Sequence, residues 1–290
     1  MRVAKSAVRR DWRWTIRRVP SAQRLVGNST VSRGLAWFLA FVGLVTVLLV
    51  GAALLMGGNR LSFVFHEQRG DAAFVMVNLL DFEDQAAQQR YMDGYARDTL
   101  VLIEALGGRR LWAARTDELL AGNAADWWPL IALVEYPSRT SFIDMVTSSE
   151  YRDRLDARAA ALARTAVYAG TPRFPFEPAL DRSYVVRLTR LSEGADYEAF
   201  EDQWGQQEHE LLERHSGVLA WSADLNPLVA EPEDVFDRIT LIEFPNATAS
   251  AGWAVDSERE TLASLGRRLL ERDVMLLMHG SADADTDRFE

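Results

Sequence analysis

The longest apolar stretch of the chain runs from residue 34 to residue 59 and contains no charged side chain. About 20 helical residues cross the ~30 Å hydrocarbon layer of a bilayer, so this stretch is long enough to span one. Its apolar core is longer, and begins further from the N-terminus, than that of a cleaved signal peptide. The pattern therefore predicts one uncleaved transmembrane helix over residues 34–58.

The balance of charge changes sharply at this stretch. Residues 1–33 form a basic head with nine Arg and Lys residues and a single acid, whereas the whole chain has a formal net charge of −10. Positive residues that flank a transmembrane helix tend to stay in the cytoplasm. We therefore expect a single-pass protein of the cell membrane, with a cytoplasmic head and an exported acidic body. The bilayer is an expected partner, and the acidity of the body disfavours nucleic acid.

Beyond the apolar stretch, β-rich runs alternate with segments that have the three-to-four-residue apolar spacing of helices. Gly107 and Gly108 are typical of a helix end, and Ser138 after Pro137 can cap the next helix. The first set of predicted elements is a strand over residues 73–80, a helix over 83–106, strands over 109–115 and 128–136, a helix over 150–164 and a strand over 165–169.

The same pattern recurs further along the chain. At an offset of 109 residues, residues 75–79 align with residues 184–188, and Trp112 aligns with Trp221. After a deletion of one residue the offset becomes 108. We interpret the pattern as a duplication. It divides the body into a first unit over residues 72–170, a Pro-rich linker over 171–182, a second unit over 183–279 and an acidic tail over 280–290.

The order strand, helix, strand, strand, helix, strand is that of a ferredoxin-like unit, in which helices cover one face of an antiparallel sheet. The other face of each sheet is apolar and must also be covered. Two units in one chain can cover each other by packing sheet against sheet. We therefore predict an α+β fold in which two tandem ferredoxin-like units form a pseudo-dimeric α/β barrel, and we expect this barrel to be monomeric.

The first unit also resembles a known family through several short motifs. They are Val77-Asn-Leu-Leu80, Tyr91 with Tyr95, Ala105-Leu-Gly-Gly-Arg-Arg-Leu-Trp112, Leu133-Val-Glu-Tyr-Pro-Ser-Arg139, Ser149-Glu-Tyr151 and Arg158-Ala-Ala-Ala-Leu162. In this order they are similar to the bacterial "domain of unknown function 1330" family of the dimeric α/β-barrel superfamily. The resemblance implies the barrel fold and brings no established reaction. The superfamily includes cofactor-free monooxygenases, isomerases and haem enzymes, so fold alone decides little.

Two positions depart from what the resemblance implies. Ala157 stands where the family leads us to expect His, and Arg187 of the second unit stands where the family has Asn. If the pocket of the family carries out chemistry, these changes put the activity of at least one unit in doubt.

Polar groups inside apolar strands are the sharpest candidates for a binding site. Asn78 interrupts the first strand, and Arg187 holds the matching position in the second unit. A buried amide or guanidinium is costly unless it has a partner, so such a position often lines a pocket or pairs across an interface. The alternative is that each side chain faces solvent or satisfies a nearby loop.

Glu135 and Glu243 form a second matched pair, each near the end of an apolar strand. A carboxylate in an apolar barrel mouth can have a raised pKa and act as a general base. The alternative is a solvated or salt-bridged group. Arg158 is a candidate partner for Glu135 or a clamp for a ligand anion, against the alternative that it belongs to a solvated helix face.

Aromatic side chains suit an apolar ligand cavity, although the helical spacing of Tyr91 and Tyr95 is equally well explained by packing on the sheet. The aromatic candidates are Tyr91, Tyr95, Trp112, Trp127 and Trp128 in the first unit and Trp204 and Trp221 in the second.

The absence of Cys excludes disulfide scaffolds, thiolate metal sites and a Cys nucleophile. His209 and His215 are six residues apart, which does not place them together on a helix face for metal binding. His279 lies at a strand end, and haem ligation is the less favoured interpretation of it. The chain has no motif for a nucleophilic Ser or for phosphate or dinucleotide binding. We therefore expect no metal and no cofactor.

Two functions from different classes remain. The leading hypothesis is a membrane-anchored protein whose barrel binds a small apolar molecule or acts as a scaffold. The alternative is a cofactor-independent enzyme of the monooxygenase or isomerase kind that uses Asn78, Glu135 and the nearby aromatic residues.

Overall fold

The computed structural model describes residues 72–179, 182–195, 197–267 and 269–281. The predicted basic head and the predicted transmembrane helix over residues 34–58 lie outside these ranges. Within the described ranges, no helix combines the length and the apolar content that crossing a bilayer requires.

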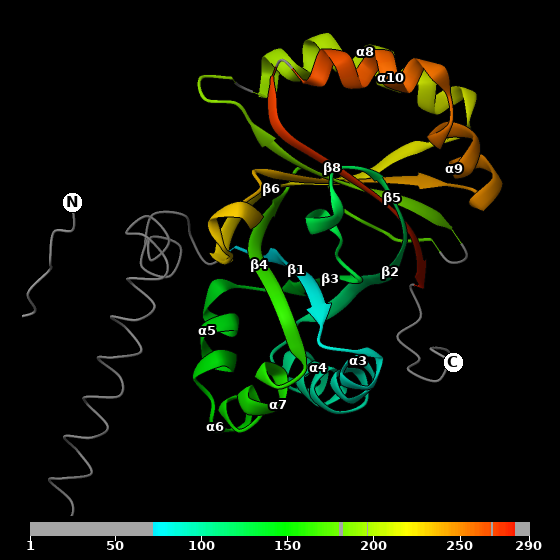
Figure 1. Cartoon of the computed structure of the whole chain (residues 1–290). Coiled ribbons are helices and arrows are strands. Elements are labelled where there is room, and N and C mark those ends of the chain that lie inside the picture. The colour runs from blue at the N-terminus through cyan, green and yellow to red at the C-terminus, as the bar shows by residue number, and fades with distance from the viewer. Residues whose placement is uncertain (1–71, 180–181, 196, 268, 282–290) are drawn as a thin grey trace, which may run out of the picture. The chain divides into compact units, whose positions relative to one another are not determined.

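The described residues form eight antiparallel strands that close into a barrel in the order β1-β3-β2-β8-β5-β7-β6-β4 (Figure 1). Each half of the chain contributes four neighbouring strands. The halves meet where β2 pairs with β8 and where β4 pairs with β6. The strands β1 to β8 are, in order, Phe74–Phe82, Arg109–Ala121, Leu130–Tyr136, Leu162–Pro172, Ser183–Leu191, Val218–Val229, Arg238–Phe244 and Leu270–Ser281.

Helices cover the outside of the barrel, those of the first half on one side and those of the second half on the opposite side (Figure 1). The first half contains α3 (Gln85–Arg90), the π-helix η2 (Tyr91–Ala96), α4 (Arg97–Ala105), the 3₁₀ turn η3 (Ala124–Asp126), α5 (Arg139–Thr147), α6 (Ser149–Arg152) and α7 (Leu155–Ala159). The second half contains α8 (Tyr197–Arg214), the 3₁₀ turn η4 (Pro232–Asp234), α9 (Ala247–Ala254) and α10 (Ser257–Gly266).

The two halves pair their strands in the same register. On β1, Asn78 lies opposite Val167 of β4, and on β5, Arg187 lies opposite Met275 of β8. These positions differ by 109 residues on β1 and β5 and by 108 on β4 and β8, as in the sequence alignment. We call two residues related by these offsets counterparts.

Side chains alternate between the two faces of the barrel wall, as the pleat of a strand requires. On β1, Val75, Val77 and Leu79 belong to the core inside the barrel, whereas Met76 packs in a separate core beneath the helices of the first half. The barrel interior is filled mainly by large side chains. They include Trp112, Trp128, Tyr168, Tyr184, Trp221 and Phe236.

Several predicted boundaries differ in the structure. The helix predicted over residues 83–106 contains the π-helical segment η2, and the helix predicted over 150–164 is two short helices that end at Ala159. The Ala- and Arg-rich composition favours helix up to residue 164, but pairing with β1 starts β4 at Leu162. Tertiary pairing therefore overrides local helix propensity here.

The linker predicted over residues 171–182 is not a spacer. Its first two residues extend β4, and Phe176 is buried in the barrel core, where its ring centroid lies 5.9 Å from that of Trp221. The tail predicted from residue 280 also begins inside a strand, because residues 280 and 281 pair with β2.

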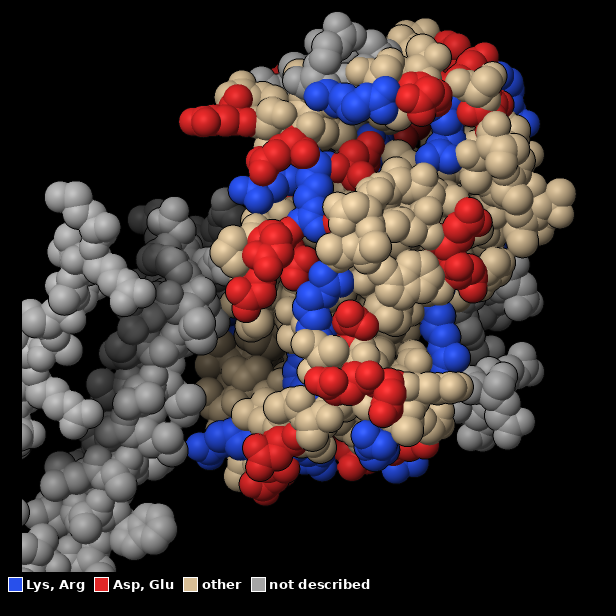
Figure 2. Space-filling model, viewed as in Figure 1, with Lys and Arg blue, Asp and Glu red and all other residues tan. Residues whose placement is uncertain are grey.

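The surface seen in Figure 2 carries acidic and basic side chains side by side over most of its area. At its lower left, in the region where Figure 1 places α5 and β4, the surface is hollowed and the hollow is lined by uncharged residues. This region belongs to the first half of the chain.

Candidate functional site

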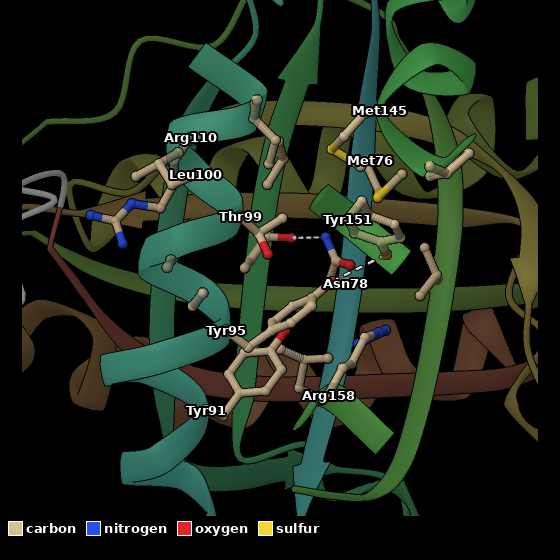
Figure 3. Close-up of a pocket in the computed structure, with 18 of the residues that line it drawn as sticks. Met76, Asn78, Tyr91, Tyr95, Thr99, Leu100, Arg110, Met145, Tyr151 and Arg158 are labelled. Atoms are coloured by element: carbon tan, nitrogen blue, oxygen red, sulfur yellow. Dashed lines mark hydrogen bonds between the residues drawn. The ribbon is translucent and has the colours of Figure 1, made fainter. Parts of the chain in front are cut away.

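A cavity of about 450 Å³ lies between the outer face of the first-half sheet and the helices that cover it (Figure 3). Most of its lining is apolar. Its polar side chains are Asn78, Tyr91, Tyr95, Thr99, Arg110, Tyr136, Tyr151 and Arg158. Four of the residues predicted from sequence, Asn78, Tyr91, Tyr95 and Arg158, are thus brought together here.

Asn78 reaches the cavity because it alternates with the inward-facing residues of β1. Its amide Nδ2 donates a long hydrogen bond of 3.4 Å to the carbonyl oxygen of Ala132. In Figure 3 this amide lies in the middle of the cavity wall, between the helix that carries Thr99 and the side chain of Tyr151. The second amide hydrogen and the Oδ1 atom of Asn78 can form hydrogen bonds with a bound molecule.

The π-helix η2 carries the two tyrosines that border one end of the cavity. π-Helical segments widen a helix locally and occur frequently at functional sites. The ring centroids of Tyr91 and Tyr95 lie 5.0 Å apart, and the Tyr95 hydroxyl donates to the hydroxyl oxygen of Tyr151 over 3.1 Å. The hydroxyl hydrogen of Tyr151 is then free to be donated to an acceptor.

Burial controls the protonation of these phenols. It raises the pKa of Tyr91 to about 12, and the nearby Arg158 guanidinium opposes this rise. Burial also raises the pKa of Tyr95, reinforced by the neighbouring hydroxyls of Tyr151 and Tyr91. Both phenols are therefore neutral at physiological pH and act as hydrogen-bonding groups.

Arg158 of α7 places a cation at the cavity. Its Nη2 donates to Thr165 Oγ1 over 3.2 Å, and its guanidinium carbon lies 5.7 Å from the centroid of the Tyr95 ring. Its Nη1 is buried and has no hydrogen-bond partner among the described residues. Thr99 is 6% exposed, and its hydroxyl likewise has no partner within the described part of the chain.

The lining of the cavity contains no carboxylate and no imidazole among the residues that the structure describes. General acid–base catalysis near neutral pH relies mostly on such groups. The described residues also contain no cluster of three or more His, Asp and Glu side chains able to hold a metal ion. The cavity is therefore equipped for binding and hydrogen bonding, and poorly equipped for proton abstraction.

The matching region of the second half is filled by an ion-pair cluster. Arg187, the counterpart of Asn78, is 3% exposed. Its Nε lies 2.7 Å from Asp273 Oδ1 and its Nη1 lies 3.2 Å from Glu208 Oε1, and its guanidinium stacks 4.1 Å from the Trp204 ring centroid. A buried arginine is tolerated because two carboxylates and an aromatic face surround it.

Larger side chains fill the rest of the second-half region. Trp204 and Trp253 replace Tyr95 and Met145 at the counterpart positions, and the space that remains there is about 30 Å³. Gly266 replaces Arg158, and a Cβ atom at this position would overlap the Trp204 ring. The two halves therefore share a fold but differ in whether the space beneath their helices is open.

Several predicted site residues lie away from the cavity. Glu135 forms an ion pair of 2.7 Å with Arg109. Glu243 accepts a hydrogen bond of 3.1 Å from the Tyr184 hydroxyl and lies 3.4 Å from Arg182. Each of these strand-end carboxylates has an arginine partner outside the cavity. Neither glutamate therefore occupies the position that a general base would require.

The predicted tryptophans lie outside the lining of the open cavity. Trp112 and Trp221 are at most 1% exposed and lie inside the barrel, on the opposite face of the wall from the cavity. Trp127 and Trp128 do not line the cavity either, and Trp128 packs in the same interior core. Large aromatic residues are needed to fill the barrel, which explains their abundance in the sequence.

Thr99 and Tyr151 line the cavity but were not candidates from the sequence. Thr99 follows Tyr91 and Tyr95 at steps of four residues, so it lies on the same face of the helix. Extending that face by one turn would have identified it. Tyr151 belongs to one of the motifs through which the first unit resembles the family. No other feature of the sequence indicated that it would line a cavity.

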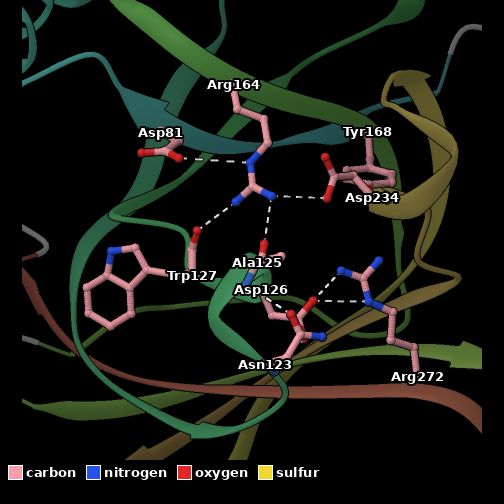
Figure 4. Close-up of polar contacts among 9 residues, drawn as sticks. All are labelled: Asp81, Asn123, Ala125, Asp126, Trp127, Arg164, Tyr168, Asp234 and Arg272. Carbon is pink, nitrogen blue, oxygen red and sulfur yellow. Dashed lines mark hydrogen bonds and ion pairs between the residues drawn. The ribbon is translucent and has the colours of Figure 1, made fainter.

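A separate polar cluster joins the two halves (Figure 4). Arg164 of β4 lies 3.5 Å from Asp234 in the second half, and Arg272 of β8 binds Asp126 in the first half. The two arginines are counterparts, as are the two aspartates, and both carboxylates are 1% exposed. Burial raises the pKa of Asp234, and the two arginines oppose the rise. Because each carboxylate meets an arginine of the other half, we assign the cluster to holding the halves together.

Comparison with known protein families gives a match in the first half of the chain. Residues 72–170 match the family described as Domain of unknown function (DUF1330). This match covers every residue that lines the open cavity except Leu228 and Val229 of β6. No protein of curated function matches the sequence.

Solved structures share the barrel at low sequence identity. An anthrone oxidase-like protein aligns with a TM-score of 0.50 and 11% identity, over 73% of this chain and 94% of that one. The RPA0582 protein of unknown function from Rhodopseudomonas palustris aligns with a TM-score of 0.36 and 23% identity, over 41% of this chain and 95% of that one. A mutant chlorite dismutase from Candidatus Nitrospira defluvii aligns with a TM-score of 0.44 and 11% identity, over 76% and 95%. The described residues form an α+β fold with a closed barrel. The likeness to the anthrone oxidase-like protein concerns this fold alone.

Proposed function

We propose that the chain binds one small, largely apolar molecule, in the cavity of its first half. The observation that carries this proposal is the contrast between the halves. The first half keeps about 450 Å³ open beneath its helices, whereas the counterpart region of the second half retains about 30 Å³. Protein interiors are normally close-packed, so an open space of this size that is edged by polar groups indicates a ligand site.

The cavity has the make-up of a small-molecule site. Its volume falls within the ~300–1,000 Å³ typical of ligand pockets, and its lining is mostly aliphatic and aromatic with a few polar groups. Apolar surface would supply most of the binding free energy, and Asn78, Tyr151 and Arg158 would fix the orientation of the ligand. In this proposal the second half is a scaffold derived by duplication, which closes the barrel and lets a single chain act as a pseudo-dimer.

The membrane anchor belongs to the same proposal. The uncharged stretch over residues 34–58 and the basic head before it support an anchored protein whose barrel is exported. Such an anchor would hold the cavity near a membrane surface, where apolar molecules concentrate.

Binding fits this cavity better than the alternative of cofactor-independent oxygenation or isomerisation. Those reactions begin with removal of a proton from the substrate, and the described lining offers only neutral phenols with raised pKa values and arginine for that task. Glu135, the candidate base from the sequence, is not part of the cavity lining. Under the binding proposal, Asn78→Ala should change the affinity for the ligand. Under the enzyme alternative, it should abolish turnover.

Filling the cavity tests the proposal. Met145→Trp introduces into the first half the residue that stands at the counterpart position in the second half, Trp253. Val101→Trp is the control, because it adds the same side chain at an exposed position of α4. We would titrate the full chain in lipid nanodiscs with 2-naphthoate and 2-naphthamide by calorimetry, with empty nanodiscs as the blank. We expect saturable binding of one equivalent that Met145→Trp removes and Val101→Trp preserves. No saturable binding of either compound, or binding unaffected by Met145→Trp, would overturn the proposal.

A further inference from the structure

The two halves of the chain balance their buried charge in different ways. In the second half, two arginines lie beneath the helices, Arg187 and Arg259, and the chain itself supplies the carboxylates that pair with Arg187, Asp273 and Glu208. The first-half counterparts of these carboxylates are Thr165 and Thr99. Both positions are therefore neutral where the cavity is open.

The first half nevertheless keeps a cation in this region. Arg158 comes from α7, and its Nη2 binds the hydroxyl of Thr165, the counterpart of Asp273. No carboxylate lies within 4 Å of this guanidinium among the described residues. Arg158 is half-buried, and its Nη1 is fully buried. A guanidinium held against an apolar lining is stabilised by a counter-charge, which in the second half is a carboxylate of the chain.

The neighbouring polar groups also present donors. Nη1 of Arg158 is buried without a partner in the described structure. The Tyr151 hydroxyl accepts from Tyr95 and so has its own hydrogen to give, and the amide of Asn78 lies beside this pair in Figure 3. These donors lie in a cavity whose described lining contains no carboxylate. An oxyanion is the group that such an arrangement binds best.

We infer that the cavity ligand carries one anionic group, a carboxylate or a similar oxyanion, and that Arg158 binds it in the place that the second half gives to Asp273. This inference rests on the proposed function and specifies its ligand class. The ligand is an apolar body with an acidic end. Tyr151 and Asn78 complete the donor set, and the apolar body extends along the aliphatic and aromatic lining.

A pair of probes of nearly the same size, one anionic and one neutral, tests the inference. In the full chain in nanodiscs, 2-naphthoate should bind at least about 10-fold more tightly than its neutral analogue 2-naphthamide, which corresponds to about 1.4 kcal/mol. Arg158→Gln should remove this preference by weakening naphthoate about 10-fold and leaving naphthamide nearly unchanged. Arg152→Gln, which removes an exposed arginine of α6 outside the cavity lining, should keep the preference.

The outcomes separate this inference from the function on which it rests. Equal affinity of the wild-type chain for both probes would overturn the anionic class while leaving the cavity as a binding site, and this comparison needs no variant to fold. A preference that persists in a folded Arg158→Gln chain would overturn the role of Arg158. Binding of neither probe would overturn both proposals together.

Discussion

The ring of Trp204 occupies the space that a side chain at residue 266 would need, and Gly266 leaves that space free. The counterparts of these two residues are Tyr95 and Arg158, which lie against each other at the open cavity. Two neighbouring positions thus account for much of the difference between the halves. A guanidinium and a smaller ring keep the first half open and polar, whereas a glycine and an indole close the second half.

Substitution of Gly266 by Ala should destabilise the fold. The added methyl group would overlap an indole that is held in a packed core, and overpacking of this kind costs roughly 1–3 kcal/mol. Gly205 of α8 is the matched control, because a Cβ atom there meets nothing within 4 Å. Gly205→Ala should leave stability unchanged or raise it by up to about 1 kcal/mol. Thermal unfolding followed by circular dichroism compares the two, and equal effects would show that Trp204 does not fill this space.

The ion-pair cluster of the second half should be structural. Asp273→Asn would leave Arg187, which is 3% exposed, short of a counter-charge, and we expect a loss of roughly 2–3 kcal/mol in the free energy of unfolding. Glu271→Gln removes an acid two residues away that forms an exposed pair with Arg190, and it should cost less than about 1 kcal/mol. Chemical denaturation of both variants measures the difference. Similar small losses would mean that the cluster is not needed to keep the second half closed.

Tyr91 gives the stability of the protein a specific dependence on alkaline pH. Its folded-state pKa of about 12 lies above its ordinary value of 10.0, so its contribution to stability is present in full below about pH 10 and is lost as the pH rises through about 12. The loss amounts to at most about 3 kcal/mol for a shift of this size. The Tyr91→Phe variant has no ionisable hydroxyl at this position. The wild-type chain should therefore lose stability relative to the variant between pH 10 and 12. Parallel curves for the two proteins would contradict the burial of this hydroxyl.

The proposed topology has its own test. A reporter that is active only outside the cytoplasm, fused after Glu290, should be active in cells, because the basic head favours a cytoplasmic N-terminus. The same reporter fused before Met1 is the control and should be silent. The reverse pattern would show that the barrel faces the cytoplasm.

The sequence predicted the barrel better than it predicted the cavity. Alternating strands and the repeated order of elements led to an α+β barrel, because both signals follow from the periodicity of strands and helices. The position of the cavity could not be inferred in this way. β1 is apolar on both faces, so its pattern does not tell which residues face the barrel interior and which face the helices.

The structure places individual candidates inside or outside the cavity for physical reasons. Asn78 stood out because it is the single polar residue in an apolar run, and it does line the cavity. Nothing in the sequence around Trp112 distinguishes an aromatic residue that binds a ligand from one that fills a barrel. For Glu135 the sequence left a general base and a salt-bridged group as alternatives, and the structure pairs it with Arg109 on the neighbouring strand. Partners supplied by another strand are visible only once the register is known.

The most direct test of a single ligand site is a crystal structure of the full chain with 6-bromo-2-naphthoate, in which the bromine is located by anomalous scattering. We expect one bromine site per chain, beneath the first-half helices between η2 and β1, with the carboxylate of the probe at Arg158. A bromine site beneath α8 and α10 of the second half, or no site in the first-half cavity, would contradict the account.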